Sequence, residues 1–484
     1  MRSFVFLVVA LAVAAAVFVL SVLAHNDYLL FAGFVVLQYV VLATAWNILG
    51  GYCGYVNFGS AAFFAVGAYT TVALHKLGAN PERYLSNTPF EPLGAVLPLS
   101  VPTLMLLGGM VAGLVGFGMG YLTLRLRGVF FAIATLAMAV VLQTFVVNWD
   151  FVGGSRGAYI IRPDAVPLGP LTLPYIQYLF LLMLLLAVLA LWIARTIERS
   201  SMGLGFATIR DDEAAAEASG VPTLGLKLIA TTVSGALMGM AGAPLPYYIG
   251  FVEPGAAFGL PYAVNSIAMP MIGGTTSWVG PLVGALLLGT LQQVATVTIS
   301  SVTNLLIVGA MLVAFVIAAP NGIVGLIQQF LRKAAPARLD WRAVSVVAIA
   351  SYCFVVGMVA IIFSLPVLQA GVQHQLPLLS ILREPLRFVQ VLLSTGTFWL
   401  GTAGVLIGAL YVVSAYGVLE LQRWGPPATA VGLLATAGLV TALAGLSTGQ
   451  QPLAMAAGTI IVAIAGVSVL LNRKVRLLYY PVPA

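Results

Sequence analysis

The sequence predicts an all-α polytopic membrane protein with about 14 transmembrane helices. The chain has 484 residues, of which 61% are apolar and only 7% are charged, whereas charged residues make up about 25% of an ordinary soluble domain. Apolar runs of about 20 residues, long enough to cross a bilayer as helices, recur along the chain. A soluble chain of this composition would expose apolar surface over most of its area. The composition therefore excludes a soluble enzyme, a disordered chain and a nucleic-acid-binding protein.

The apolar runs define fourteen predicted spans. The first run resembles a secretory signal, but its apolar core is too long for one and further spans follow, so we expect a retained first span. Pro270 predicts that the eighth span is broken or partial, and the two longest runs can be accommodated by tilting. The predicted spans are residues 4–24, 28–49, 58–74, 94–124, 128–147, 173–194, 226–249, 262–275, 279–298, 302–319, 344–365, 388–418, 428–447 and 451–471.

The basic residues predict which side of the membrane each segment occupies. If the N-terminus lies inside and each span crosses once, 15 of the 21 Lys and Arg residues fall in inside segments and the other 6 fall outside. Cytoplasmic segments of membrane proteins carry such an excess of Lys and Arg. We therefore expect both termini to be cytoplasmic, and the net charge of +7 to reflect topology.

A basic, proline-containing stretch at residues 320–342 separates ten predicted spans from the last four. Such a composition is typical of a linker. The sequence therefore predicts a membrane core at 1–325, a cytoplasmic linker at 326–342, and an additional four-helix membrane block at 343–484 whose role it leaves open.

The chain carries little that could catalyse a reaction. It contains no Gly-Lys dipeptide and therefore no phosphate-binding loop that ends in Gly-Lys-Ser/Thr. Its two cysteines, Cys53 and Cys353, lie far apart, and its three histidines have no second ligand at metal spacing. We expect no catalytic residue, no metal and no cofactor, and a chain that is not an enzyme.

The longest polar segment, residues 195–225, contains a predicted short amphipathic helix. Helix-favouring residues run from 211 to 218, acidic residues come early, and Gly220 and Pro222 follow as a stop signal. Three alanines give this helix a smooth face: Ala214, Ala215 and Ala218. A rigid helix with small side chains suits docking into a groove on a soluble partner. The alternative, a helix lying on lipid headgroups, is less favoured because this helix is acidic and lacks large apolar side chains.

Neutral polar residues inside predicted spans are candidates for a translocation path. They suit a zwitterionic solute because a strong fixed charge would trap it, although each could equally form interhelical hydrogen bonds. The candidates are Asn57, Ser60, Gln143 and Asn265.

Glycines predict close packing between helices and one break in helical structure. Small residues spaced four apart let helices approach closely, and we interpret the glycine pairs as structural. These pairs are Gly109 and Gly113, Gly116 and Gly120, Gly235 and Gly239, and Gly280 and Gly284. The run GGYCGYVNFGS at residues 50–60 is expected to interrupt the helices on either side of it.

Six segments in chain order resemble one family of transport proteins. Glu213-Ala214-Ala215 followed by Gly220 is similar to the "EAA" coupling helix of bacterial ABC importer permeases, and the other segments resemble the M-type permeases of branched-chain amino acid importers. The resemblance covers about residues 1–330. The segments are LGGYCGYVNFGSAAFFAVGAY (49–69), LRLRGVFFAIATLAMAVV (124–141), GFATIRDDEAAAEASGV (205–221), GALMGMAGA (235–243), GGTTSWVGPLVGALLL (273–288) and APNGIVGL (319–326).

The resemblance implies a permease core of ten spans with a coupling helix around residues 208–221, in a bacterial cytoplasmic (inner) membrane. It also implies a second permease subunit, two ABC ATPase subunits that hydrolyse ATP, and an extracytoplasmic solute-binding protein. The residues implied to contact the ATPase are Arg210, Asp211, Glu213, Ala214, Ala215 and Gly220.

Two departures from the family leave other functions open. The family usually has Ser and His where this chain has Asn57 and Ser60, and ordinary members lack the block at 343–484. The substrate is expected to be a branched-chain or related amino acid, with urea or a short amide as the near alternative. A secondary carrier with 14 spans would be expected to hold an ionisable residue within the membrane, and a membrane enzyme would need clustered catalytic side chains.

Overall fold

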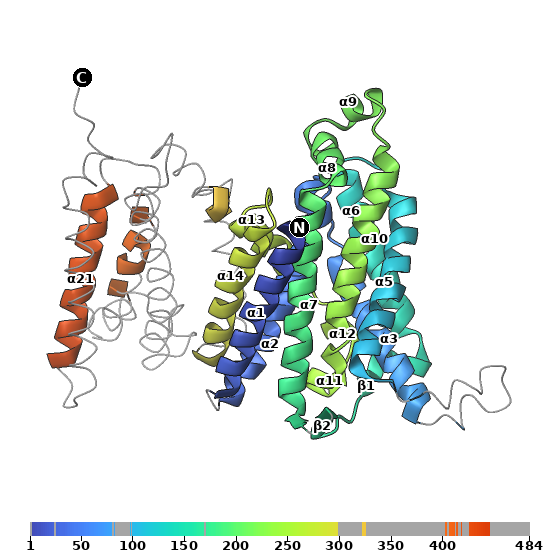
Figure 1. Ribbon diagram of the computed structural model, residues 1–484, viewed down its shortest axis with the longest axis horizontal. Helices are drawn as coiled ribbons and strands as arrows, with labels where there is room; N and C mark the ends of the chain where they lie inside the picture. The colour runs from blue at the N-terminus through green and yellow to red at the C-terminus, as the bar shows by residue number, and fades with distance from the viewer. Residues whose placement is uncertain are drawn as a thin grey trace, which may run out of the picture. The chain divides into compact units, whose positions relative to one another are not determined.

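The structure is a computed structural model, and contacts divide the chain into two compact units (Figure 1). The first unit comprises Met1–Gln293 with Ala319–Val324, and the second comprises Val294–Ala318 with Gly325–Ala484. The structure describes residues 2–23, 26–79, 82, 97, 99–168, 171–298, 322–325, 402–403, 406–411, 413–414, 418 and 425–445. The predicted spans 302–319, 344–365 and 451–471, the predicted linker, and most of 388–418 lie outside these residues.

The described part of the chain is mainly helical. Up to residue 298 the helices are α1 (Arg2–Leu23), α2 (Asp27–Asn47), the π-helical turn η1 (Ile48–Tyr52), α3 (Ser60–Ala79), α5 (Val101–Thr123), α6 (Val129–Val147), the short 3₁₀ turns η3 (Asp150–Val152) and η4 (Gly154–Arg156), α7 (Tyr175–Glu198), α8 (Ser201–Asp211), α9 (Glu213–Ala218), α10 (Thr223–Gly242), α11 (Leu245–Ile249), α12 (Pro254–Ala257), α13 (Leu260–Gly273) and α14 (Val279–Thr298).

Six helical stretches of the described residues are long and apolar enough to cross a membrane. They confirm the polytopic membrane architecture, and each coincides with a predicted span. α3 is also helical where a span was predicted, but it is not among the six. The six are Val5–Leu23, Asp27–Tyr52, Val101–Thr123, Val129–Val147, Tyr175–Glu198 and Thr223–Ile249.

Local chemistry explains where the elements depart from the prediction. The predicted span 226–249 is divided into α10 and α11 beside Pro244, which lacks the N–H that a continuous helix would use. α13 is only 14 residues long and contains Pro270, as expected of a partial span. The connections also contain two short antiparallel ribbons, which the sequence did not predict: β1 (Ala158–Tyr159) pairs with β4 (Phe251–Val252), and β2 (Ala165–Leu168) pairs with β3 (Leu171–Pro174).

α10 forms the centre of the first unit, where it packs against α5, α3 and α2. Glycines allow this approach. A Cβ on Gly67 of α3 would overlap the carbonyl of Gly239 on α10, and a Cβ on Gly235 would lie 3.0 Å from the carbonyl oxygen of Ala112 on α5. The predicted role of the glycine pairs in helix packing is confirmed here, and because lipid does not drive helices together, such contacts are what hold them.

Replacing Gly239 with alanine should therefore destabilise the protein. The new methyl group would overlap Ala112 and lie 2.6 Å from the Gly108 carbonyl oxygen, and overpacking of this kind costs about 1–3 kcal/mol. Thermal unfolding in detergent would measure the change. Gly118→Ala on α5 is the control, because a Cβ there meets nothing within 4 Å and alanine favours the helix. Equal unfolding temperatures for the two variants would contradict the packing.

The two ends of the first unit differ. α8 and α9 lie at one end, and α11 and β1 lie at the other (Figure 1). The N-terminal part of α1 is at the α8 end, since the Phe6 ring lies 5.0 Å from the Trp278 ring and 3.9 Å from the guanidinium carbon of Arg195, near the end of α7. The predicted break at residues 50–60 is confirmed, because residues 53–59 lie outside helices between η1 and α3.

In the second unit, α21 (Gly425–Gly445) is the longest described helix and coincides with the predicted span 428–447. Tyr411 is buried against it: the Thr436 hydroxyl donates to the Tyr411 hydroxyl over 2.9 Å. A Cβ on Gly432 would lie 3.5 Å from the Tyr411 ring.

Candidate functional site

The short helix α9 is capped at both ends by its own sequence. At its start, the Asp212 carboxylate accepts from the amides of Ala214 and Ala215 over 2.9 and 3.1 Å, as an N-cap does. At its end, Gly220 has a φ of 82°, and the Val221 amide donates to the Ala216 carbonyl over 3.0 Å. This closure needs a residue in the left-handed region, which glycine supplies without strain. The predicted stop signal is therefore confirmed, but the helix predicted from residue 211 begins at Glu213, because Asp212 caps it and Asp211 is the last residue of α8.

The predicted contact residues lie at the end of α8, on α9 and just after α9, and they differ in exposure. Arg210, Asp211, Ala214, Ala215 and Gly220 are exposed to solvent, and the Arg210 guanidinium lies 3.5 Å from the Asp211 carboxylate. Glu213 instead points inward, and only 12% of its side chain is exposed. The exposed side of α9 thus consists mainly of backbone and small side chains. The inward carboxylate of Glu213 attaches α9 to the rest of the unit.

Glu213 forms a buried ion pair with Lys227 at the start of α10. The Lys227 ammonium lies 2.5 Å from the Glu213 carboxylate, and only 3% of the lysine side chain is exposed. The same ammonium donates to the Leu124 carbonyl over 3.3 Å and to the Tyr55 hydroxyl over 3.2 Å. All three N–H bonds of the lysine therefore have acceptors, which is the condition under which a buried charge is tolerated.

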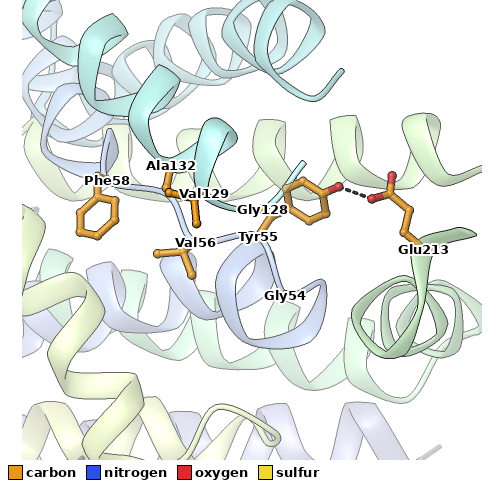
Figure 2. A pocket seen from close by; sticks show the side chains of 8 residues that line it. All are labelled: Gly54, Tyr55, Val56, Phe58, Gly128, Val129, Ala132 and Glu213. Atoms are coloured by element: carbon orange, nitrogen blue, oxygen red, sulfur yellow. Dashed lines mark hydrogen bonds between the residues drawn. The ribbon is translucent and has the colours of Figure 1, made fainter. Parts of the chain in front are cut away.

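Tyr55 and Arg127 complete this group around Glu213. The Tyr55 hydroxyl donates to the second carboxylate oxygen of Glu213 (Figure 2), and the Tyr55 ring packs edge-on against Phe131, with centroids 5.1 Å apart. Arg127 lies 3.6 Å from Glu213 and 3.1 Å from Glu217. We call Tyr55, Arg127, Glu213 and Lys227 the anchor cluster. It joins α9 to α10, to the segment 53–59, and to the turn between α5 and α6.

The anchor cluster holds Glu213 in its charged form. Burial alone would raise the pKa of Glu213, but hydrogen bonds from Lys227 and Tyr55, with the charges of Lys227 and Arg127, outweigh burial and lower the pKa. A carboxyl group with a lowered pKa contributes stability above its unfolded pKa and loses it as the pH falls through the folded value. The attachment of α9 is therefore complete at neutral pH. It weakens only when the pH falls below the ordinary pKa of a glutamate and approaches the lowered pKa of Glu213.

A mainly apolar cavity of 490 Å³ lies beside the anchor cluster (Figure 2). Segment 53–59 forms one wall and the start of α6 forms another. Gly54, Val56 and Phe58 are exposed along this segment, whereas Tyr55 and Asn57 are buried. Of these two buried residues, only Tyr55 lines the cavity. The lining residues are Gly54, Tyr55, Val56, Phe58, Gly128, Val129, Ala132 and Glu213. The buried position of Asn57 keeps its amide out of this cavity.

Three of the four predicted path residues lie close together in the core. The Ser60 hydroxyl is hydrogen-bonded over 2.7 Å to that of Ser266 on α13. The neighbouring Asn265 exchanges hydrogen bonds of 2.8 and 3.3 Å with Gln292 of α14. The Asn57 side-chain oxygen accepts from the Gly59 amide over 2.7 Å.

Among the residues that the structure describes, the buried side-chain nitrogen of Asn57 has no hydrogen-bond partner. A buried amide donor with no acceptor is costly unless water or a solute satisfies it. Gln143, the fourth candidate, is half-buried on α6, and no hydrogen bond joins it to the other three.

Sequence reasoning missed most of the anchor cluster. Lys227, Tyr55 and Arg127 come from three separate segments, and their pairing with Glu213 depends on the fold. One signal was available: Lys227 lies just inside the predicted span 226–249. An ionisable residue there demands a partner, and the nearest acidic residues along the chain are those of α9.

Comparison with known proteins identifies the family. A model of the family described as "Branched-chain amino acid transport system / permease component" matches residues 28–316. The high-affinity branched-chain amino acid transport system permease protein LivM of Escherichia coli (strain K12) is 26% identical over 307 residues, which cover 59% of this chain and 67% of that protein. LivM of Salmonella typhimurium (strain LT2) is 27% identical over 307 residues, with the same coverage. No solved structure matches. Since the family model spans more than half of the chain, the protein belongs to the family of permease components of branched-chain amino acid transport systems.

Proposed function

We propose that this chain is the membrane-spanning permease subunit of an ATP-driven ABC importer for branched-chain or related amino acids. The observation that carries the proposal is α9, a short capped helix that presents small exposed residues and is anchored through Glu213 to the membrane helices. The family gives the transport class, and the two relatives named LivM give the class of solute.

The proposal assigns ATP hydrolysis to other chains. One of two ABC ATPase subunits would dock against α9 and the residues beside it, where Arg210, Asp211, Ala214, Ala215 and Gly220 are exposed. A second permease subunit, identical or different, would complete the membrane part, and an extracytoplasmic solute-binding protein would deliver the solute. α9 would then face the cytoplasm of a bacterium, with both termini on the same side of the inner membrane, in line with the positive-inside rule.

The anchor cluster supplies a rigid route for the conformational change. When the ATPase subunits close, they would displace α9. Lys227 is hydrogen-bonded to Glu213, to Tyr55 and to the Leu124 carbonyl. A displacement of α9 would therefore move α10, segment 53–59 and the α5–α6 turn together. We assign Glu213 a positioning role inside the permease, and the exposed residues of α9 the contact with the ATPase.

Asn57, Ser60 and Asn265 are proposed to lie near the path of the solute, with Gln143 as a separate candidate on α6. The first three are neutral and buried close together, and α3 meets α13 at the Ser60–Ser266 hydrogen bond. The remaining proposals concern architecture: a ten-span core at 1–325, a cytoplasmic linker at 326–342, and four further spans at 343–484 that support the complex from its periphery.

Uptake of labelled solutes by cells with and without the gene tests the function. We expect deletion to reduce uptake of leucine, isoleucine or valine, and we expect this uptake to stop when ATP is depleted while the membrane potential is maintained. Loss of urea uptake alone would instead favour the urea or short-amide alternative. Uptake that follows the ion gradient and survives ATP depletion would identify a secondary carrier and contradict the proposal.

A further inference from the structure

A second cavity lies at the end of the first unit that is opposite to α9. It has a volume of 190 Å³ and lies between the last turns of α3 and the β1 segment. Its lining is more polar than that of the cavity beside α9. The lining residues are Val72, His75, Lys76, Gly157, Ala158, Tyr159 and Ile160. Under the proposed orientation this cavity is on the external side, where solute arrives.

Two nitrogen-bearing side chains in this cavity are held in place by hydrogen bonds, which leave two N–H donors of Lys76 and one ring nitrogen of His75 for a ligand. The Lys76 ammonium donates to the Phe151 carbonyl over 2.7 Å and lies 5.8 Å from the centre of the Phe151 ring. Nδ1 of His75 is hydrogen-bonded to the Tyr247 hydroxyl over 3.0 Å. Among the described residues, two N–H bonds of Lys76 and Nε2 of His75 have no further partner.

The charge of Lys76 is not neutralised within the described part of the chain, where it forms no ion pair with a carboxylate. A lysine in the last turn of a helix does interact favourably with the helix dipole, but the dipole accounts neither for the cavity nor for His75 beside it. Gly157 forms part of the cavity wall and cannot be replaced by a residue with a side chain, because its φ is 74° and a Cβ would lie 2.6 Å from the Val252 carbonyl oxygen.

We infer that this cavity binds the carboxylate of the arriving amino acid, with Lys76 as the charged donor and the His75 ring beside it. A volume of 190 Å³ is below the range of about 300–1,000 Å³ that holds drug-sized ligands, so the ligand is small. A lysine ammonium is a compact point charge that pairs with a single carboxylate. The inference rests on the proposed function, because it takes the transported solute as the ligand.

The test is solute uptake by the complete transporter in proteoliposomes, measured as a function of the concentration of loaded binding protein. For Lys76→Met we expect the maximal rate of leucine uptake to fall about tenfold, as for loss of a hydrogen bond to a charged group. The half-saturating concentration of binding protein should stay within about twofold of wild type, and Lys76→Arg should recover most of the rate. Arg156→Met, which removes an exposed cation outside the cavity lining, should leave both parameters unchanged.

Several results would overturn the inference. A raised half-saturating concentration with an unchanged maximal rate would assign Lys76 to the surface that docks the binding protein. Wild-type kinetics for Lys76→Met would show that the cavity plays no part in uptake. Failure of both Lys76→Met and Lys76→Gln to assemble would make Lys76 a structural residue. Absence of leucine uptake by the wild-type transporter is distinct from these results, since it would contradict the proposed function itself.

Discussion

Lys227→Met should uncouple ATP hydrolysis from solute uptake. The substitution removes the cation that neutralises Glu213, of which only 12% is exposed, and breaking a buried ion pair by removing one partner costs about 3–5 kcal/mol. α9 would lose its attachment to α10, so motion of the ATPase would no longer reach the membrane helices. We expect uptake by the assembled transporter to fall at least about tenfold, since each 1.4 kcal/mol is a factor of ten, while ATP hydrolysis continues.

Two further variants separate this effect from general damage. Removing both charges, as in Lys227→Met combined with Glu213→Leu, leaves no isolated buried charge and should recover part of the stability lost in the single variant. Arg127→Met removes a partner whose side chain is 57% exposed, and an exposed ion pair contributes only about 0–1 kcal/mol. Normal uptake by Lys227→Met, or equal losses in Lys227→Met and Arg127→Met, would show that the anchor cluster does not transmit the motion.

Ala215→Arg should abolish binding of the ATPase while leaving the permease folded. Ala215 is exposed on α9, and its amide and carbonyl are already engaged within the helix and its caps. A long charged side chain would therefore project into the partner's groove without disturbing the fold, and a bulky group at the centre of a close interface costs several kcal/mol. Co-purification of the ATPase in mild detergent is expected to be lost.

Ala215→Ser is the matched control, because serine is small and should retain the partner. Thermal unfolding of the purified permease should be the same for both variants, since neither alters a buried contact. An ATPase that still co-purifies with Ala215→Arg, at wild-type yield, would place the contact elsewhere on the chain.

The fold of the first unit was largely predictable because lipid imposes simple rules on sequence. A span needs about 20 apolar residues, and this rule located all six of the helices that are long and apolar enough to cross a membrane in the described part of the chain. The caps of α9 were also predictable, because Gly220 and the early acidic residues act over one or two turns of the chain.

Contacts between distant segments were not predictable in the same way. Glu213 was expected among the residues that contact the ATPase because it is part of the motif. The motif does not show on which side of the helix the side chain lies, and in the structure only 12% of it is exposed. The pairing with Lys227 depends on the turn at Val221 and Pro222 that leads into α10. The β1–β4 ribbon joins residues about ninety positions apart through only two residue pairs, too short for any alternating pattern to be visible.

The most direct measurement of the central claim is photo-crosslinking from the exposed face of α9. A photoreactive amino acid at Ala215 would be activated in the native membrane, and the crosslinked product identified by mass spectrometry. Ile161, which is 88% exposed at the opposite end of the first unit, serves as the control position. If α9 couples this permease to ATP hydrolysis, Ala215 will crosslink to a protein with the phosphate-binding loop of an ABC ATPase and Ile161 will not. Crosslinking of the ATPase from Ile161, or only of lipid from Ala215, would contradict this account.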